Sequence, residues 1–267
     1  MSHSDLSEPI ADTCLYKSRQ QKNILLPPTI MKNMHLFIFF ICALPFADCK
    51  KSSGGKTQPP VTDTATLQGS ASFRIGAAID VNMLQTNTLY RTTLIAQHNS
   101  ITIENAVKWP TVHPAINAFD FTGGDYIADF CAAKNKRLHG HCLIWYQFNP
   151  GWLNNFTGDS LAWENLMKTH IQTVVGHYKG KATGWDVVNE AFRDDDGTLR
   201  VEDRHAGAEY DDGCLWARHL GRDYIARAFQ YAHEADPDAL LFYNEYGQEW
   251  SDAKTNAIIS LVNDFKA

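Results

Sequence analysis

The sequence predicts an α/β fold, a parallel (β/α)8 (TIM) barrel of which about five of the eight units are present. From residue 69 onward, β-branched or aromatic runs alternate with amphipathic stretches, and no hairpin signal joins two runs. Polar and reactive residues follow the runs, where barrel enzymes build their active sites. The sequence contains neither a GxGxxG turn nor a Walker motif, which disfavours a doubly wound nucleotide-binding sheet.

Short apolar runs are the expected strands, and longer amphipathic segments are the expected helices. Strands are expected at Phe73–Ala78, Ser100–Ile103, Arg137–Ile144, Thr183–Val188 and Leu240–Tyr243. Helices are expected at Thr88–His98, Gly124–Asn135, Ser160–Tyr178, Ala217–Ala235 and Asp252–Lys266. Because each strand is followed by a helix, the strands are expected to run parallel.

Residues 31–49 have the composition of an export signal. A short cationic segment precedes an apolar run from Leu36 to Ala47, which is too short to span a bilayer as a helix. Cys49, followed by Lys-Lys-Ser, resembles the lipidated cysteine of bacterial lipoproteins. We therefore expect an exported protein, either secreted or anchored at the cell envelope, that meets a membrane only through a lipid on Cys49.

The segments on either side of this signal differ from the barrel pattern. Residues 1–30 are polar and aperiodic, and we interpret them as a mis-annotated upstream extension, with Met31 as the better start. Residues 50–68 are rich in Lys, Ser, Gly and Pro, which predicts a flexible linker. The partial catalytic barrel is therefore assigned to residues 69–267.

Composition excludes several classes of protein. With 24 Lys and Arg against 30 Asp and Glu, the chain has no basic surplus to neutralise a nucleic-acid backbone, so no nucleic-acid partner is expected. Six cysteines without paired short spacing fit neither a zinc ribbon nor a disulfide scaffold. We interpret Cys131, Cys142 and Cys214 as packing residues. We expect a monomer with no cofactor and no metal.

Carboxylate and amide side chains at the expected strand ends indicate sugar chemistry. Asn189 and Glu190 follow one another at the end of the fourth strand, and Glu104 follows the second. Protonating a glycosidic oxygen requires a carboxylic acid whose pKa is raised by burial or by a nearby negative charge. Seven tryptophans and ten tyrosines supply flat faces for sugar rings. By itself, however, an Asn-Glu pair at a strand end is more often a cap or a loop salt bridge.

Four longer segments narrow the choice. They are Glu104–Trp109 (ENAVKW), Arg137–Trp145 (RLHGHCLIW), Trp185–Phe192 (WDVVNEAF) and Leu241–Tyr246 (LFYNEY). With these segments in this order, residues 69–267 resemble glycoside hydrolase family 10, the retaining endo-β-1,4-xylanases. The resemblance implies hydrolysis of internal β-1,4-xylosidic bonds of xylan by double displacement, with xylan or xylo-oligosaccharides as the partner.

The resemblance also implies a role for each matching position. Glu190 is similar to the general acid/base, and Asn189 to its partner on the sugar 2-hydroxyl. The remaining substrate-binding positions are Glu104, Asn105 and Lys108 in the glycone subsites, His141 and Trp145 beneath the ring at the cleavage point, and Tyr246 on the aglycone side.

Two features depart from the family pattern. The family usually continues after Trp145 with His-Ser-Gln, whereas this chain has Tyr146, Gln147 and Phe148, so two polar sugar contacts are expected to be absent or replaced by stacking. The loop over residues 193–217 is longer than usual and contains Asp-Asp-Asp-Gly at 194–197. This segment resembles a calcium loop, but a solvated loop is the favoured interpretation.

Retention needs a second carboxylate about 5 to 5.5 Å from the first as the nucleophile. The resemblance implies a glutamate ending the seventh strand, and we expect this chain to stop before it, at Ala267. Neither Glu104 nor Glu245 stands where a nucleophile is expected, so none is assigned. We therefore expect a truncated gene product or partial sequence that is inactive alone, with unpaired edges on its first and fifth strands.

Two alternatives remain open. One is a non-catalytic xylan-binding relic that keeps the glycone subsites without a nucleophile. The other is a metal-dependent barrel hydrolase, because His139 and His141 alternate on one strand face and could chelate zinc. The sequence contains no HExxH motif to support the second.

Overall fold

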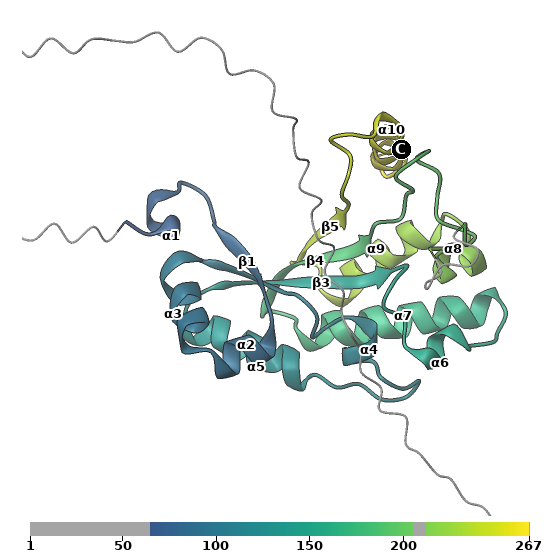
Figure 1. Ribbon diagram of the computed structural model, residues 1–267. Coiled ribbons are helices and arrows are strands. Elements are labelled where there is room, and N and C mark those ends of the chain that lie inside the picture. The colour runs from purple at the N-terminus through teal and green to yellow at the C-terminus, as the bar shows by residue number, and fades with distance from the viewer. Residues whose placement is uncertain (1–64, 205–211, 267) are drawn as a thin grey trace, which may run out of the picture. The chain divides into compact units, whose positions relative to one another are not determined.

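The five expected strands form one parallel sheet. The computed structural model describes residues 65–204 and 212–266, and in this part of the chain the strands pair in sequence order (Figure 1). They are β1 (Gly76–Ile79), β2 (Ser100–Ile103), β3 (Arg137–Trp145), β4 (Ala182–Asn189) and β5 (Leu240–Asn244). All four pairings are parallel. Parallel strands in sequence order with helical crossovers make a partial (β/α)8 barrel, as predicted.

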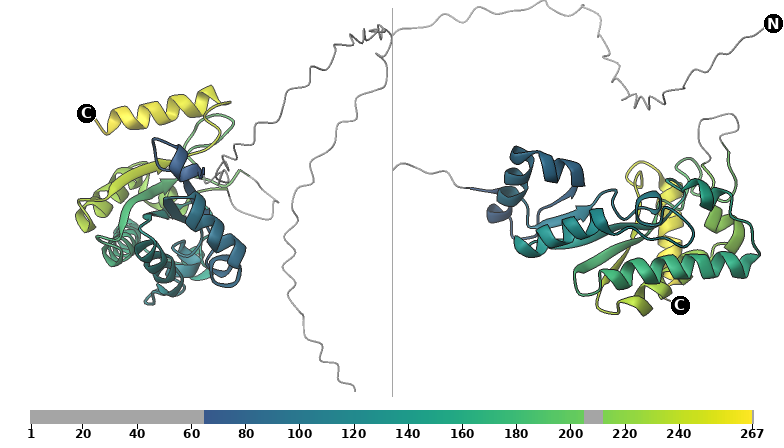
Figure 2. Two further views of the ribbon diagram at one scale, coloured as in Figure 1. Left: turned by 90° about the vertical axis from the view of Figure 1, so that its left-hand side faces the viewer. Right: turned by 90° about the horizontal axis from the view of Figure 1, so that it is seen from below.

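Helices of very different length connect the strands. They are α1 (Leu67–Ser70), α2 (Val81–Thr86), α3 (Thr88–Gln97), α4 (Trp109–Val112), α5 (Thr122–Ala133), α6 (Gly151–Asn154), α7 (Ser160–His177), α8 (Leu215–Leu220), α9 (Tyr224–Ala235) and α10 (Asp252–Asp264). Helix α5 contacts β2 and β3, α7 contacts β3, and α9 contacts β4 and β5 (Figures 1 and 2). Helix α7 also packs on α9, so the crossover helices form a continuous layer.

Polar residues before several helices explain where those helices begin. Asp159 accepts a hydrogen bond from the Ala162 N–H at the start of α7. Asn87 and Ser251 cap α3 and α10 in the same way. Each cap satisfies one of the N–H groups that a helix leaves without an intrahelical partner.

The core lies between the central strands and the helix layer. In β4, the side chains of Trp185, Val187 and Val188 are fully buried. Gly140 on β3 allows the Trp185 indole to approach, because a Cβ atom at Gly140 would lie 2.1 Å from the indole ring. Strand β3 changes register against β4 between His141 and the end of the strand, which marks a bulge.

The structure corrects two of the expected elements. The predicted helix Ala217–Ala235 is two helices, α8 and α9, because Gly221 takes a φ of +67° and ends α8. The first strand begins at Gly76 instead of Phe73, whose side chain is exposed. Helices α1, α2, α4 and α6 were not predicted, because four to six residues are too few to show a periodicity.

The N-terminal predictions fall almost entirely outside the described residues. The extension over 1–30, the export signal over 31–49 and the linker up to residue 64 lie there. Helix α1 begins at Leu67, so the last two residues of the expected linker are helical. Within residues 65–204 and 212–266, no helix is both long and apolar enough to cross a membrane.

Candidate active site

The strand ends bring the predicted site residues to one edge of the sheet. Glu104 follows β2, Trp145 ends β3, Glu190 follows β4, and Tyr246 lies two residues after β5. The register pairs Trp145 with Asn189, so the ends of the two central strands are level. This carboxyl edge is where barrel enzymes place their chemistry.

Glu190 has an unusual backbone conformation. Its φ of +56° is in the left-handed region, which few residues other than glycine adopt. The Glu190 N–H donates to the Asn244 carbonyl at 2.9 Å, which ties the residue to β5. The Trp145 indole N–H donates to Glu190 Oε2, also at 2.9 Å. Strand β5 therefore holds the backbone of Glu190, and Trp145 on β3 orients its carboxylate.

The surroundings of Glu190 favour its protonated form. Burial raises the pKa of the Glu190 carboxyl above its ordinary value, and the negative charge of Glu245 raises it further. Hydrogen bonds from Trp145 and Asn189 and the charge of Arg200 act in the opposite direction but do not cancel the rise. A carboxylic acid with a raised pKa can deliver a proton near neutral pH.

Asn189 is fixed beside this acid. Its side chain is buried, and Asn189 Oδ1 accepts a hydrogen bond from Asn244 Nδ2 at 2.7 Å. That bond sets the orientation of the amide, so its nitrogen is the atom that can donate to Glu190 or to a bound hydroxyl. The β5 residue Asn244 therefore helps to position both members of the Asn189-Glu190 pair.

Asp186 joins the two histidines of β3. Hydrogen bonds link Asp186 to His139 Nε2 at 3.0 Å and to His141 Nδ1 at 2.8 Å. Burial alone would raise the pKa of Asp186, but the two imidazole bonds lower it below its ordinary value. His139 and His141 do share one strand face, as expected. However, the described part of the chain holds no group of three or more His, Cys, Asp or Glu side chains suited to a metal ion.

The predicted glycone residues lie together beside Trp145. Lys108 Nζ donates to Asn105 Oδ1 at 3.0 Å, and it lies 4.9 Å from the centre of the Trp145 ring. Asn105 and the neighbouring Glu104 are exposed, so both side chains are accessible to a ligand. Charged and amide side chains beside an indole face are the groups that bind sugar hydroxyls and sugar rings.

The segment after Trp145 carries stacking contacts. The Phe148 ring stacks on the Trp145 indole, with centroids 5.3 Å apart and an interplanar angle of 10°. Tyr146 is buried, its hydroxyl accepts from Gln147 Nε2 at 2.9 Å, and the Arg200 guanidinium lies 4.3 Å from its ring centre. Aromatic and cation–π contacts therefore stand where the family motif has polar residues. Arg200 is not among the predicted site residues, because nothing in the local sequence indicates a contact that spans more than fifty residues.

Tyr246 and the acidic loop are connected. Tyr246 is partly exposed, and its hydroxyl donates to Asp194 Oδ2 at 2.6 Å. Asp196 accepts from Arg204 and from Thr198, both at 2.6 Å. In the described part of this loop, Asp194 and Asp196 are therefore half exposed and held by hydrogen bonds and ion pairs.

The three cysteines in this part of the chain are buried, in agreement with their interpretation as packing residues. Burial raises the pKa of the Cys131 thiol to about 12. Burial likewise raises the pKa of Cys142 and of Cys214. A thiol that stays protonated is a poor nucleophile, so these side chains contribute packing and not chemistry.

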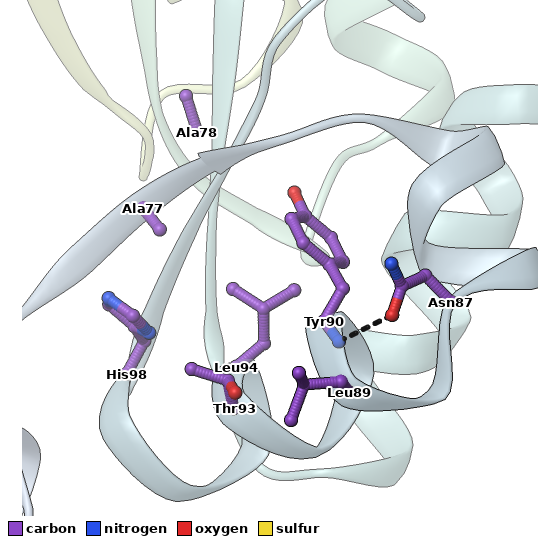
Figure 3. Close-up of a pocket in the computed structure, with 8 residues that line it drawn as sticks. All are labelled: Ala77, Ala78, Asn87, Leu89, Tyr90, Thr93, Leu94 and His98. Atoms are coloured by element: carbon purple, nitrogen blue, oxygen red, sulfur yellow. Dashed lines mark hydrogen bonds between the residues drawn. The ribbon is translucent and has the colours of Figure 1, made fainter.

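A cavity of about 390 Å³ lies away from the strand ends, between β1 and α3 (Figure 3). Figure 3 shows Tyr90 and Leu94 on α3 pointing toward Ala77 and Ala78 on β1. Leu89, another lining residue, is largely exposed. The lining contains no carboxylate and is mostly apolar, so it offers no acid for glycoside chemistry.

Comparisons with known proteins agree with this geometry. The family model of Glycosyl hydrolase family 10 matches residues 65–267. Endo-1,4-beta-xylanase B of Paenibacillus barcinonensis is 40% identical over 196 residues, which cover 72% of this chain and 54% of that protein. The Beta-1,4-xylanase of Dictyoglomus thermophilum is 39% identical over 178 residues, or 66% of this chain and 46% of that protein.

Solved structures lead to the same family. Xylanase 10B from Thermotoga petrophila RKU-1 in complex with xylobiose superposes with a TM-score of 0.67 at 33% identity, covering 76% of this chain and 59% of that one. Native xylanase 10B from Thermotoga maritima gives a TM-score of 0.63 at 34% identity, covering 72% of this chain and 56% of that one. The chain therefore spans about half the length of the relatives that it matches.

Proposed function

Since the chain belongs to glycosyl hydrolase family 10, we propose that it forms the acid/base half of an endo-1,4-β-xylanase that hydrolyses internal bonds of xylan with retention. The proposal is carried by the half-buried carboxyl of Glu190, with its raised pKa, at the carboxyl end of β4. The relatives named as xylanases supply the substrate class.

Glu190 acts twice in this scheme. It first gives its proton to the glycosidic oxygen as the bond to the anomeric carbon breaks and a nucleophilic carboxylate bonds to that carbon. It then takes a proton from the water that displaces the enzyme from the sugar. The hydrogen bond from Trp145 keeps the carboxyl in place during both steps, and Asn189 donates to the sugar 2-hydroxyl.

We propose that the nucleophile is not among the carboxylates of this chain. Glu245 is the acidic residue at the neighbouring strand end, but its side chain is only 3% exposed and pairs with Lys254 at 2.8 Å. Its other oxygen accepts from the Tyr243 hydroxyl at 2.6 Å. A carboxylate bound at both oxygens is not available to attack an anomeric carbon. Glu104 is assigned to the glycone subsites.

Substrate binding is proposed along the strand ends. Glu104, Asn105 and Lys108 contact hydroxyls of the glycone sugars, and His141 and Trp145 lie beneath the ring at the cleavage point. Phe148 stacks on the Trp145 indole beside this position. Tyr246 supports the first aglycone sugar.

Chemical rescue tests the division of roles. The chain alone is expected to leave 4-nitrophenyl β-xylobioside intact, and added azide is expected to yield α-xylobiosyl azide and nitrophenolate. Azide would supply the missing nucleophile by bonding to the anomeric carbon while the phenolate departs. Glu190→Gln should slow rescue with substrates whose leaving group needs a proton. Turnover of xylan without azide would show that the chain holds its own nucleophile.

The complete engagement of Glu245 agrees equally with the xylan-binding alternative, in which no carboxylate attacks the sugar. It predicts binding of xylo-oligosaccharides with no azide rescue. Failure to bind any xylo-oligosaccharide would contradict both functions.

Export is also a proposal, based on the composition of residues 31–49. Replacing Cys49 by alanine is expected to move the cellular protein from the detergent phase to the aqueous phase in Triton X-114 partition. Unchanged partition would contradict a lipid at Cys49.

A further inference from the structure

A fully buried ammonium group lies at the β5 end of the sheet. Lys254 is in the first turn of α10, and its Nζ lies 2.6 Å from Asp194 Oδ1 and 2.8 Å from Glu245 Oε1. It also lies 3.9 Å from the centre of the Tyr246 ring. Burying a charge is costly unless partners compensate it, and two carboxylates and a ring face do so here.

These contacts connect three segments that are distant in the sequence. Asp194 lies on the loop after β4, four residues beyond Glu190. Tyr246 follows β5, and its hydroxyl bonds to the same Asp194 carboxylate. The α10 N-terminus closes the arrangement, because Ser251 Oγ donates to the Asp194 carbonyl at 2.9 Å.

The packing leaves little room for another arrangement. A Cβ atom at Gly197, on the loop after β4, would lie 2.4 Å from the Ala253 carbonyl oxygen, so the loop and the helix are in direct backbone contact. Gly197 has a φ of +68°, which favours glycine at this contact. The loop after the acid residue is therefore seated on α10.

We propose that Lys254 is a positioning residue of the substrate cleft, which holds the Tyr246 ring as the aglycone platform by binding Asp194, Glu245 and the ring face together. The inference rests on the proposed function, because the platform has a use only if a sugar chain binds. Tyr246 is held at its hydroxyl by Asp194 and at its ring face by the ammonium group, while 40% of the residue remains exposed for a ligand.

Oligosaccharides of two lengths test this role in the full chain. Calorimetric titration with xylohexaose, which reaches the aglycone side, is compared with titration by xylobiose, which the glycone subsites can hold alone. Lys254→Met should raise the dissociation constant for xylohexaose about tenfold, the value of one aromatic platform, and leave that for xylobiose unchanged. Lys254→Arg, which keeps the charge, should restore most of the affinity.

Lys168→Met is the matched control. Lys168 Nζ likewise lies over a tyrosine ring, 5.0 Å from the centre of Tyr231, and 3.7 Å from Glu234, but on the half-exposed surface of α7. Lys168→Met should change neither the affinity for xylohexaose nor that for xylobiose. If Lys254→Met impairs folding, Asp194→Asn removes one carboxylate of the same cluster at a half-exposed position and should give the same length-dependent loss.

Hydrogen exchange measured without sugar separates the outcomes. Residues 192–200 and 244–251 should lose protection together in Lys254→Met and keep it in Lys254→Arg. Retained protection, or unchanged xylohexaose affinity in a chain that binds both sugars, would overturn the inference alone. An unsubstituted chain that binds neither sugar would overturn the proposed function and the cleft role of Lys254 with it.

Discussion

The central strands of the sheet and its outer strands share parallel pairing but differ in their surroundings. On β4, Trp185 and Val187 are fully buried, whereas on β5 Leu240 is 59% exposed and Phe242 41%. Glu190 follows β4, and Trp145, which donates to its carboxylate, ends β3. The difference indicates that the apolar centre creates the dry surroundings that raise the pKa of Glu190.

The largest loss of stability is expected when the space at Gly140, beside the buried Trp185, is filled. Gly140→Ala would place a Cβ atom 2.1 Å from the ring of Trp185, which is fully buried. We expect the free energy of unfolding to fall by about 3 kcal/mol or more, measured by urea denaturation.

Gly176→Ala is the control for that substitution. Gly176 lies in helix α7, and a Cβ atom there would meet nothing within 4 Å. Alanine should stabilise the helix there by about 0.5 to 1 kcal/mol. Equal effects of the two substitutions would show that contact with Trp185 is not what the Gly140 position requires.

A second test removes the largely buried negative charge of Asp186 on β4. Asp186→Asn leaves an amide that cannot accept hydrogen bonds from both His139 and His141 in the way the carboxylate does. We expect a loss of about 2 kcal/mol in the free energy of unfolding at pH 7. The loss should shrink as the pH falls through the lowered pKa of Asp186, because protonation removes the same charge.

The matched surface pair is Asp125 with His177, joined at 2.7 Å with both side chains about one third exposed. Asp125→Asn should cost no more than about 0.5 kcal/mol, because water screens a contact at an exposed position. A comparable loss at the two aspartates would contradict the importance of burial.

The fold was predictable where local pattern and tertiary packing agree. All five strands and four of the five long helices lie within a few residues of their predicted positions, because short apolar runs and amphipathic stretches have the lengths and periodicities of strands and helices. The exception is the segment containing Gly221. Its backbone turns at a positive φ, while the flanking residues keep an apolar periodicity that conceals the break.

The positions of the candidate site residues at the strand ends were predictable, and the side chains that support them were not. Glu190 and Trp145 belong to contiguous motifs at strand ends. Lys254, by contrast, reaches Asp194 across sixty residues, and the Arg200 guanidinium meets Tyr146 across a similar distance. A lysine in an amphipathic helix is ordinarily exposed, so only the tertiary structure shows this one to be buried.

A third test concerns the stability of the fold in acid, which depends on two buried histidines. His113 and His170 are fully buried, with their Nδ1 atoms 3.2 Å apart, and burial lowers the pKa of both. In the unfolded chain each imidazole takes up a proton below about pH 6.5, whereas the folded state keeps them neutral. Stability should therefore fall by about 1 kcal/mol or more between about pH 6.5 and 5.

His170→Leu should make that decline shallower, as measured by urea midpoints at pH 7.5 and 5.5. His233→Gln, on the exposed surface of α9, should leave the decline unchanged. An equally steep decline in His170→Leu would assign the acid sensitivity to other groups.

The smallest effect is expected at the outer strand. Leu240→Thr on β5 removes a side chain that is already 59% exposed, so the free energy of unfolding should change by less than about 0.5 kcal/mol. Leu138→Thr at the start of β3, where the leucine is 2% exposed, should cost about 2 kcal/mol or more. Because an exposed strand with apolar side chains can pair with another molecule, Leu240→Thr should also reduce any self-association seen by sedimentation velocity. A large loss of stability at Leu240 would mean that β5 is as well covered in solution as the central strands are.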